Sequence, residues 1–325
     1  MSVIDGKSIL ITGGTGSLGQ SLVRYLLEDT KVRRIAIYSR DELKQSQMRE
    51  KFKDDSRLRW FLGDIRDLDR LKRALHNVDF VIHAAALKQV DTGEYNPMEF
   101  IKTNVLGSQN VIEACIDAGV KRVVALSTDK ASSPINLYGA TKLTADKLFV
   151  AANNYSIAYG TSFSVVRYGN VMGSRGSIIP FFKDLAVKHR PLPVTDLRMT
   201  RFLISLEQAV KFVIDSLETM SGGELYVPRI PSIKIVDLAR AIAPNTEIVE
   251  IGIRPGEKLH EEMISVDDSR RTISLGDRYV VNPVIADWGY SIPPGVPMAE
   301  GSAYRSDTNT EWMSEEDIRK YISRL

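Results

Sequence analysis

Short apolar runs alternate with amphipathic segments along the first 165 residues of the chain. The apolar runs are rich in β-branched residues and predict strands, whereas the segments between them repeat apolar residues every three or four positions and predict helices. Strands that are apolar throughout and separated by helices are typical of a parallel sheet covered on both faces. We therefore expect an α/β fold with a Rossmann-like, doubly wound parallel sheet. The predicted strands are SILIT, RIAIY, RWFLG, FVIHA, RVVALS and FSVVRY.

The regular alternation ends after about residue 168. The next stretch, YGNVMGSRGSIIP, is rich in glycine and polar residues and predicts a loop. Helical patterns return in SLEQAVKFVIDSLE and KIVDLARAIA, and RTISLGDRYVVNP predicts a late strand region. We expect residues 1–168 to form the Rossmann domain, joined by some later segments. Residues 169–325 are then mainly a smaller, interleaved C-terminal part that binds the substrate.

Composition narrows the class of protein. The 325 residues carry a net charge of +2 without a block of like charges, which argues against a nucleic-acid partner. No apolar run approaches the roughly 18 residues of a membrane span, and the N-terminus lacks the pattern of a secretory signal. The single cysteine, Cys115, excludes an internal disulfide and a cysteine-based zinc site, and we expect no metal. These features favour a soluble protein of the reducing cytoplasm.

A glycine-rich turn follows the first predicted strand and opens the first predicted helix. Gly13, Gly16 and Gly19 are spaced as T-G-x-x-G-x-x-G. Glycine lets such a turn tighten and lets the backbone approach a pyrophosphate, whose charge is stabilised at the helix N-terminus. The strand before the turn and the helix after it favour a dinucleotide site over an ordinary turn. We expect the cofactor to contact Gly13, Thr15, Gly16, Ser17, Leu18 and Gly19.

The end of the second predicted strand distinguishes NAD from NADP. An acidic residue about 20 positions after the glycine turn typically binds the ribose 2′-hydroxyl of NAD. That place holds Ser39 and Arg40, and an arginine can pair with the 2′-phosphate of NADP. Asp41 and Glu42 fit the start of the next helix, where acids are favoured. We therefore expect residues 1–168 to bind NADP, with further contacts from Lys44, Asp64, Ile65, Ala84, Ala85, Ala86 and Lys88, whereas His83 fits a hydrogen-bonded histidine at a strand end.

Two acid–base pairs lie within residues 127–142, STDKASSPINLYGATK. Tyr138 and Lys142 are four residues apart, so on a helix they share a face and can act together on a hydroxyl during hydride transfer. We expect Lys142 and a cationic nicotinamide to lower the pKa of Tyr138 toward neutrality. Asp129 and Lys130 add an acid and a base that alcohol oxidation alone does not need. Taken alone, the first pair also fits a solvated helix face, and the second fits a surface turn.

Several stretches together resemble one family across nearly the whole chain. They are YSRDELKQSQM, HAAALKQVDTGEYNP, STDKASSPINLYGATK, YGNVMGSRGSIIP, MTRF and RPGEKLHE. The chain resembles the extended short-chain dehydrogenase/reductase superfamily and, within it, the short, soluble UDP-N-acetylglucosamine 4,6-dehydratases that invert C5. The longer membrane-anchored relatives typically carry Met where this chain has Tyr138, which favours the short group.

The resemblance implies a reaction that uses both acid–base pairs. Hydride leaves C4 for NADP, water is eliminated across C5 and C6, and the hydride returns to C6. The resemblance assigns Lys130 as the base and Asp129 as the acid of the elimination, with Tyr138 and Lys142 serving the hydride steps and Thr128 beside them. A lysine base works best with a pKa near about 7–8, and we expect burial beside Lys142 and the nicotinamide to lower the pKa of Lys130. The substrate contacts implied are Lys88, Asn170, Arg175, Thr195, Arg201, Arg254 and Glu257.

Other readings stay open at this point. Asp91, Thr92 and Gly93 replace the small apolar residues and proline more usual in the family, which leaves the exact acyl-amino sugar open. A nucleotide-sugar 4-epimerase would need Tyr138 and Lys142 only, and a non-catalytic NADP-binding regulator would need neither pair. The resemblance favours a homo-oligomer, a dimer or a hexamer. It also favours the product UDP-2-acetamido-2,6-dideoxy-β-L-arabino-hexos-4-ulose, on the way to pseudaminic acid or a related sugar.

Overall fold

A large, mostly parallel sheet forms the centre of the molecule. The computed structural model describes residues 2–53, 55–173 and 178–323. Within these ranges, one sheet has the strand order β16-β14-β15-β10-β6-β5-β4-β1-β2-β3, and all neighbours from β10 to β3 are parallel. The order of β3, β2, β1, β4, β5 and β6 is that of a doubly wound fold, which confirms the predicted class. The parallel strands are β1 (Ser8–Thr12), β2 (Arg34–Ser39), β3 (Leu58–Leu62), β4 (Phe80–His83), β5 (Arg122–Leu126), β6 (Ser162–Val166) and β10 (Leu225–Pro228).

Burial explains why the apolar runs became inner strands. Every residue of β1 and β4 is buried, as expected for strands covered by helices on both faces. The edge strand β3 is buried only at Leu58 and has exposed or half-buried positions along the rest of its length. All six strands expected in the first 168 residues are present. At most of these strands, an observed end lies one residue from the predicted end.

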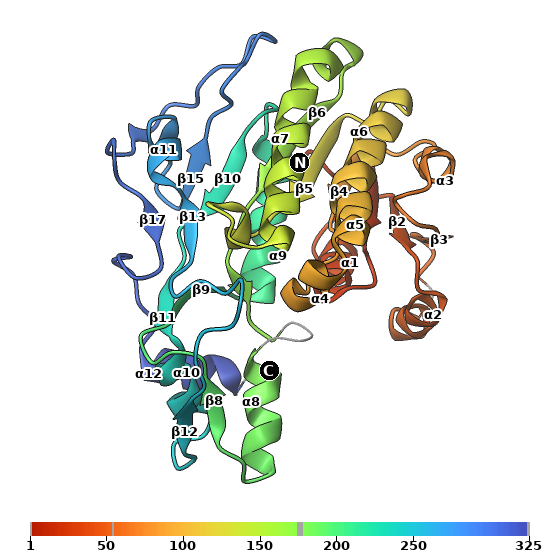
Figure 1. Cartoon of the computed structure of the whole chain (residues 1–325). Helices are drawn as coiled ribbons and strands as arrows, with labels where there is room; N and C mark the ends of the chain where they lie inside the picture. Colours follow the sequence, from red (N-terminus) through yellow and green to blue (C-terminus); the bar gives the residue numbers. More distant parts are fainter. Residues whose placement is uncertain (1, 54, 174–177, 324–325) are drawn as a thin grey trace.

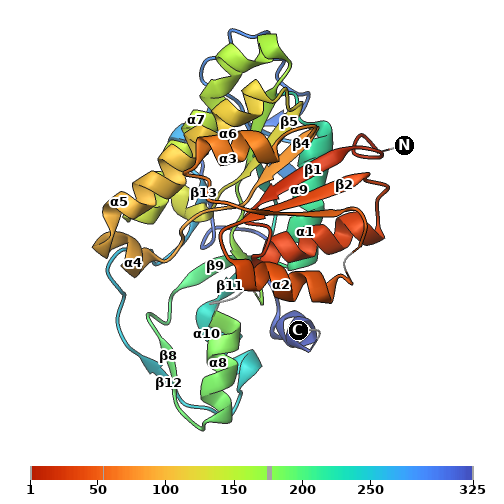
Figure 2. The same cartoon turned by 90° about the vertical axis from the view of Figure 1, so that its right-hand side faces the viewer.

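Helices cover both faces of this sheet. Figures 1 and 2 show α3, α6 and α7 on one face and α1 and α9 on the other. A π-helix, η1, joins α5 to α6 without a break in direction. The helices are α1 (Ser17–Glu28), α2 (Glu42–Lys51), α3 (Leu68–Ala74), α4 (Val90–Tyr95), α5 (Pro97–Phe100), η1 (Ile101–Leu106), α6 (Gly107–Asp117), α7 (Leu137–Ser156) and α9 (Leu206–Thr219), with short 3-10 turns η2 (Asp129–Ala131) and η3 (Ile157–Tyr159).

A smaller lobe lies at one end of the sheet and has apolar clusters of its own. It appears in the lower part of Figure 1, where α8, β8, β12 and α10 lie together. Phe182, Leu192 and Ile235 belong to one of its clusters, and Leu238 and Ile318 belong to another. Its elements are β7 (Asn170–Val171), α8 (Ile178–Val187), β8 (Leu192–Val194), β9 (Thr200–Ile204), β11 (Ser232–Lys234), α10 (Ile235–Ile242), β12 (Ile248–Glu250) and α12 (Glu315–Ile322).

The chain passes between the two parts more than once. After residue 168 it returns to the large sheet to add α9 and β10, and later β14, β15 and β16. The expected late strand region is therefore confirmed, whereas the division at residues 168 and 169 stays a prediction. The remaining elements are β13 (Glu262–Ile264), α11 (Val266–Ser269), β14 (Thr272–Ser274), β15 (Arg278–Val281), β16 (Val296–Pro297) and β17 (Tyr304–Arg305).

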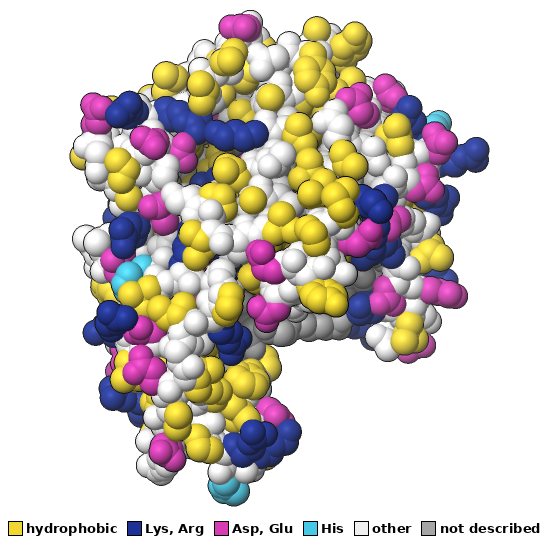
Figure 3. Space-filling view, in the orientation of Figure 1, with side chains coloured by type: hydrophobic (Ala, Val, Ile, Leu, Met, Phe, Trp, Pro, Cys, Tyr) yellow, Lys and Arg dark blue, Asp and Glu magenta, His cyan; other side chains and the backbone are white. Residues whose placement is uncertain are grey.

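The visible surface carries charges of both signs. Figure 3 shows Lys and Arg side chains interspersed with Asp and Glu on this face, in keeping with a net charge of +2. Among the described residues, none of the helices combines the length and the apolar character needed to cross a lipid bilayer. Nor do the described residues bring three or more His, Cys, Asp or Glu side chains together in a way that could hold a metal ion.

Candidate active site

A cavity of about 1140 Å³ opens at the carboxyl ends of the parallel strands. Ligands of doubly wound folds bind at this edge of the sheet, where the loops after the strands converge. Arg201 of strand β9 completes the wall together with Arg254, Glu257 and Glu261. The lining includes every residue expected to bind the cofactor: Gly13, Thr15, Gly16, Ser17, Leu18, Gly19, Ser39, Arg40, Lys44, Asp64, Ile65, Ala84, Ala85, Ala86, Lys88, Tyr138 and Lys142.

The glycine turn forms one wall of the cavity. Gly13 has φ +66°, and a Cβ there would lie 2.9 Å from the Ala85 backbone, so no larger residue fits. Gly16 is the N-cap of α1 and provides no side-chain acceptor for the first-turn amides. These N–H groups and the positive end of the helix dipole suit a pyrophosphate. The geometry thus fits a dinucleotide at this wall.

Two basic side chains mark the end of the cavity beyond β2. Arg40 NH1 lies 3.3 Å from Asp64 Oδ2, and Lys44 Nζ lies 2.7 Å from Asp41 Oδ2. The side chains of Arg40 and Lys44 are each about half exposed, at 50% and 46%. Both cations therefore line the cavity beside carboxylates that already pair with them. Ser39 is buried at the end of β2, and its hydroxyl accepts a hydrogen bond from Gln45.

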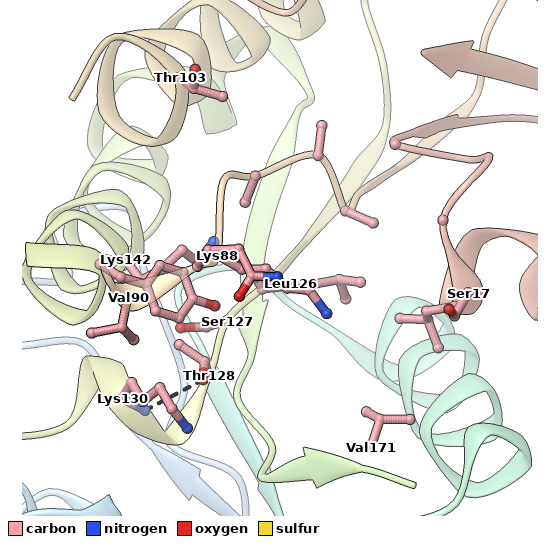
Figure 4. Close-up of a pocket in the computed structure, with 18 of the residues that line it drawn as sticks. Ser17, Lys88, Val90, Thr103, Leu126, Ser127, Thr128, Lys130, Lys142 and Val171 are labelled. Atoms are coloured by element: carbon pink, nitrogen blue, oxygen red, sulfur yellow. Dashed lines mark hydrogen bonds between the residues drawn. The ribbon is translucent and has the colours of Figure 1, made fainter. Parts of the chain in front are cut away.

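Tyr138 and Lys142 lie one turn apart near the start of α7, and both are buried. Asn136 caps this helix by accepting a hydrogen bond from the Gly139 amide at 2.7 Å. Lys142 Nζ donates to the Leu126 carbonyl at 2.7 Å, which fixes the ammonium group at the end of β5. Figure 4 shows Lys142 and Lys88 in the left half of the view of the cavity and Ser17 of α1 at the right.

The pKa of Tyr138 differs from the expectation. Burial raises it to about 12, although the charge of Lys130 and a hydrogen bond with Thr128 oppose the shift. Burial also lowers the pKa of Lys142. The expected lowering of the tyrosine pKa is therefore not a property of the protein groups alone. An additional positive charge at the phenol, such as that of an oxidised nicotinamide, is needed to favour tyrosinate.

Asp129 and Lys130 form an ion pair with a third residue. Lys130 Nζ lies 3.1 Å from Asp129 Oδ1 and 3.2 Å from Glu261 Oε1. The side chains of Asp129 and Glu261 are 1% and 2% exposed, and that of Lys130 is 25% exposed. Thr128 also donates its hydroxyl to Asp129 Oδ1 at 2.9 Å. Lys130 and Glu261 line the cavity, whereas Asp129 lies directly behind them.

The predicted lowering of the Lys130 pKa is wrong for this arrangement. Burial alone would lower the pKa, but the carboxylates of Asp129 and Glu261 outweigh it and raise the pKa above the ordinary lysine value. The pKa of Asp129 is raised as well, by burial and by the negative charge of Glu261. Each member of the pair therefore has an increased affinity for a proton.

The loop that contains RPGEK reaches from the smaller part to the start of α7. The Asn136 side chain donates to the Gly256 carbonyl at 2.8 Å, which brings Glu257 near β9. Arg201 NH2 on β9 lies 3.3 Å from Glu257 Oε1, and Arg201 Nε lies 3.6 Å from Glu261 Oε1. The Arg201 side chain is only 6% exposed, so these carboxylates balance a largely buried cation.

Most of the residues expected to bind the substrate line the cavity, but not all of them do. Asn170 and Arg254 line the cavity with Arg201, Glu257 and Lys88. Thr195 does not, since it is buried elsewhere and its hydroxyl contacts Met199 Sδ at 3.1 Å. Arg175 lies outside the described residues.

His83 has the predicted role of a buried, hydrogen-bonded histidine. Its Nδ1 lies 2.8 Å from the Thr12 hydroxyl, and its Nε2 lies 3.4 Å from that of Ser108. Burial lowers its pKa to about 3, so the imidazole is neutral at physiological pH.

Three further residues of the site, Glu261, Lys258 and Asn136, were not predicted from the sequence. All three line the cavity. Lys258 Nζ donates to the Ser132 carbonyl at 2.6 Å and so ties the RPGEK loop to the loop after Lys130. The available signal was the charge cluster in RPGEKLHEE, of which only Arg254 and Glu257 had been assigned.

Comparisons with known proteins agree with this geometry. Residues 9–283 match a family described as polysaccharide biosynthesis protein. The chain is 54% identical over 330 residues to an inverting UDP-N-acetylglucosamine 4,6-dehydratase of Campylobacter jejuni, and the match covers 99% of this chain and 98% of the relative. It is 41% identical over 280 residues to a UDP-glucose 4-epimerase of Rickettsia canadensis, which covers 84% and 82% of the two chains.

Solved structures with a similar fold include a dehydratase as well. The chain superposes on Pen from Bacillus thuringiensis with a TM-score of 0.90 and 38% identity, covering 99% of each chain. It superposes on a dTDP-glucose 4,6-dehydratase from Streptomyces venezuelae, solved with NAD bound, with a TM-score of 0.71 and 25% identity, covering 86% and 93%. The chain therefore belongs to the polysaccharide biosynthesis protein family, in the group of the inverting UDP-N-acetylglucosamine 4,6-dehydratases.

Proposed function

We propose that this protein is a UDP-N-acetylglucosamine 4,6-dehydratase that inverts C5 and recycles NADP. The observation that carries the proposal is a second acid–base pair beside the first: Lys130 lines the same cavity as Tyr138 and Lys142, and Asp129 lies behind Lys130. Tyr138 and Lys142 lie on α7, and Lys130 with Asp129 stands on the adjoining turn η2. An epimerase has no use for the second pair. The 54% identity to an inverting dehydratase supports the substrate and the stereochemistry.

The cavity fits a nicotinamide dinucleotide along its glycine wall. The uncapped amides of α1 suit the pyrophosphate, and Tyr138 with Lys142 suits the nicotinamide end. When bound, the cofactor takes a hydride from C4 of the sugar and later returns it to C6. NADP is favoured over NAD because Arg40 and Lys44 line the far end, where their charges can pair with a 2′-phosphate.

Tyr138 serves the first step as a base. Its phenolate takes the proton of the C4 hydroxyl while the C4 hydrogen leaves as hydride, so the C4–O bond becomes a carbonyl. The carbonyl makes the neighbouring C5–H bond acidic. Lys142 supports the phenolate by its positive charge and remains anchored to the Leu126 carbonyl.

Lys130 and Asp129 serve the elimination. The neutral Lys130 amine takes the C5 proton, the C5–C6 double bond forms, and the C6 hydroxyl leaves as water with a proton from Asp129. Hydride addition at C6 and addition of a solvent-derived proton to the opposite face of C5 then complete the sugar, and Tyr138 releases to solvent the proton that it took from the C4 hydroxyl. The elimination leaves Lys130 as an ammonium and Asp129 as a carboxylate 3.1 Å apart, and transfer of the proton back to Asp129 prepares the pair for the next turnover.

The ion pair seen in the structure is then the resting form of the elimination groups. The proton rests on Lys130, as the raised pKa of Lys130 requires. Moving one proton from Nζ to Asp129 Oδ1 converts the pair into a neutral base and a neutral acid. The raised pKa of Asp129 makes this transfer easier than it would be for an exposed aspartate.

Mass spectrometry of the nucleotide sugar tests the proposal. After incubation of UDP-N-acetylglucosamine with the protein and NADP, we expect a product lighter by one water and no net reduction of the cofactor. A product of unchanged mass with inverted C4 would instead support a 4-epimerase, the activity named for the Rickettsia relative. No conversion with tight cofactor binding would support a non-catalytic NADP-binding regulator.

A further inference from the structure

Glu261 has no role in the reaction described so far, although its position is central. It follows the RPGEK loop, and its side chain is 2% exposed in the cavity wall. A buried carboxylate is costly unless cations balance it. Its Oε1 atom lies near both Lys130 Nζ and Arg201 Nε, at 3.2 Å and 3.6 Å. Its Oε2 atom has no hydrogen-bond partner among the described residues, so these two cations carry the balance at Oε1.

The backbone of Glu261 is held independently of these cations. The Glu261 amide donates to the Ser306 hydroxyl at 2.9 Å, and the Ser306 amide donates to the Glu261 carbonyl at 2.8 Å. The Ser306 hydroxyl also lies 2.7 Å from that of Thr200, the neighbour of Arg201 on β9. The carboxylate is therefore presented from a fixed support, and the two long cationic side chains are oriented by it.

We propose that Glu261 is a positioning residue that holds Lys130 of the elimination pair and Arg201 of the substrate wall on one carboxylate, an inference that rests on the proposed function. Its charge keeps the proton of the resting pair on Lys130 and orients Nζ toward Asp129. Arg201, with its planar guanidinium, suits the diphosphate of a nucleotide sugar. Glu261 thus joins the group that recognises the substrate to the group that removes its C5 proton.

The charged groups around Lys130 determine how removal of the Glu261 charge changes the protonation of Lys130. Removing the negative charge of Glu261 leaves the cations of Arg201 and Lys258 nearby, and among the described residues Asp129 is then the one ion-pair partner left to Nζ. Because the charge of Glu261 raises the pKa of both Asp129 and Lys130, its removal lowers the proton affinity of both groups, and the neutral amine of Lys130 becomes more populated at a given pH. The ionisable groups among the described residues whose charges act on Lys130 or respond to it are Asp129, Glu261, Arg201, Lys88, Tyr138 and Lys258.

The test compares Glu261→Gln with Glu257→Gln. Gln keeps the size of the side chain and removes its charge, and Glu257 pairs with Arg201 but has no contact with Lys130. We expect the rising limb of kcat against pH for water loss to move toward lower pH by about one unit or more in Glu261→Gln. In Glu257→Gln, KM changes while the position of that limb does not.

A second measurement does not depend on turnover. Reductive methylation of Lys130 at fixed pH, followed by peptide mass spectrometry on the cofactor-loaded protein, reports the neutral amine. We expect about tenfold faster labelling in Glu261→Gln, because each pKa unit changes the neutral fraction about tenfold. Glu261→Asp keeps the charge but shortens the side chain by one methylene, so its labelling rate should fall between those of the wild type and Glu261→Gln.

The outcomes separate this inference from the proposed function. A wild type that does not release water refutes the proposed function before the variants are compared. A wild type that does release water, together with an unmoved pH limb and unchanged Lys130 labelling in folded Glu261→Gln, refutes the positioning role. If Glu261→Gln does not fold, the decision passes to Glu261→Asp. Its carboxylate is one methylene shorter, so labelling between wild-type and tenfold-increased rates supports the role, and a wild-type rate overturns it.

Discussion

Arg40 is the residue that we expect to select NADP over NAD. Its guanidinium lines the cavity beyond β2 at the place where an NAD-binding protein typically has an acid. Hydrogen bonds to charged groups contribute about 1.5–3 kcal/mol each. We expect Arg40→Ala to weaken NADP about tenfold to a hundredfold while NAD changes little, as measured by titration calorimetry.

Arg66 provides the control for this change. Its Nε pairs with the same Asp64 carboxylate at 3.4 Å, but its side chain is not part of the cavity lining. Arg66→Ala should therefore leave the ratio of NADP to NAD affinity as it is in the wild type. Equal losses of both cofactors in Arg40→Ala would contradict the assignment to NADP.

His83 gives the protein a pH-dependent stability. Its pKa is lowered to about 3 by burial, whereas the unfolded chain titrates near the ordinary value of about 6.5. The unfolded state therefore binds a proton first as the pH falls, and the stability present above about pH 6.5 is lost progressively below it. Between about pH 8 and about pH 5 this loss amounts to about 2 kcal/mol.

Urea unfolding at the two pH values measures the effect. We expect His83→Gln to lose less stability than the wild type on acidification, by about 2 kcal/mol. His76→Gln, which changes an exposed histidine, should retain the wild-type difference. An identical loss in the wild type and His83→Gln would show that His83 does not control this dependence.

At the scale of elements, the start of α7 joins the two parts of the site. Asn136 caps the helix that carries Tyr138 and also holds the RPGEK loop through Gly256. Loss of an N-cap costs about 1 kcal/mol. We expect Asn136→Ala to lose about this stability in urea unfolding and, in addition, to raise the KM for the nucleotide sugar, because Arg254 and Glu257 lie in the released loop.

Ser314 offers a matched cap far from the cavity lining. It caps α12 with a capping box, so Ser314→Ala should lose about the same stability, about 1 kcal/mol, without a change in KM. If Asn136→Ala and Ser314→Ala were alike in KM, the link between the α7 cap and substrate binding would be refuted.

At the scale of the whole molecule, the hydrophobic pattern was enough to predict the six parallel strands of the first 168 residues, whereas β10 and β16 of the same sheet were not predicted. The inner strands are apolar because both of their faces are covered, and this signal is local in the sequence. The short strands β8, β12 and β17 carry no such signal, since they are only two or three residues long and pair with distant segments. Their positions depend on tertiary contacts that no local pattern records.

Some residues of the site were likewise predicted from the sequence, and others were not. Gly13 and Tyr138 lie in motifs whose spacing predicts their place, Lys130 was assigned by resemblance, and all three line the cavity. Glu261 acts on Lys130 from 131 positions away in the sequence, so the raised pKa of Lys130 was not predictable from STDK alone. Thr195 was expected at the cavity by resemblance, yet its hydroxyl packs against Met199.

The stereochemistry of the product is a property of the whole active site. The inverting relative and Tyr138 support addition of the C5 proton from the face opposite to its removal. We expect proton NMR of the freshly formed product to show the L-arabino 4-keto-6-deoxy sugar, with deuterium at C5 when the reaction runs in heavy water. A D-xylo sugar as the first species formed would contradict inversion.

The site combines a hydride pair, Tyr138 and Lys142, with a separate elimination pair, Lys130 and Asp129. Lys130→Ala and Tyr138→Phe, each first shown to be folded and loaded with NADP, test this combination most directly through the absorbance of reduced cofactor and the mass of the sugar. We expect Lys130→Ala to release no water, yet to show a slow rise in reduced cofactor when UDP-N-acetylglucosamine is added. Tyr138→Phe should suppress both signals. Water loss at a near wild-type rate in Lys130→Ala would contradict the account, because the base would then lie elsewhere.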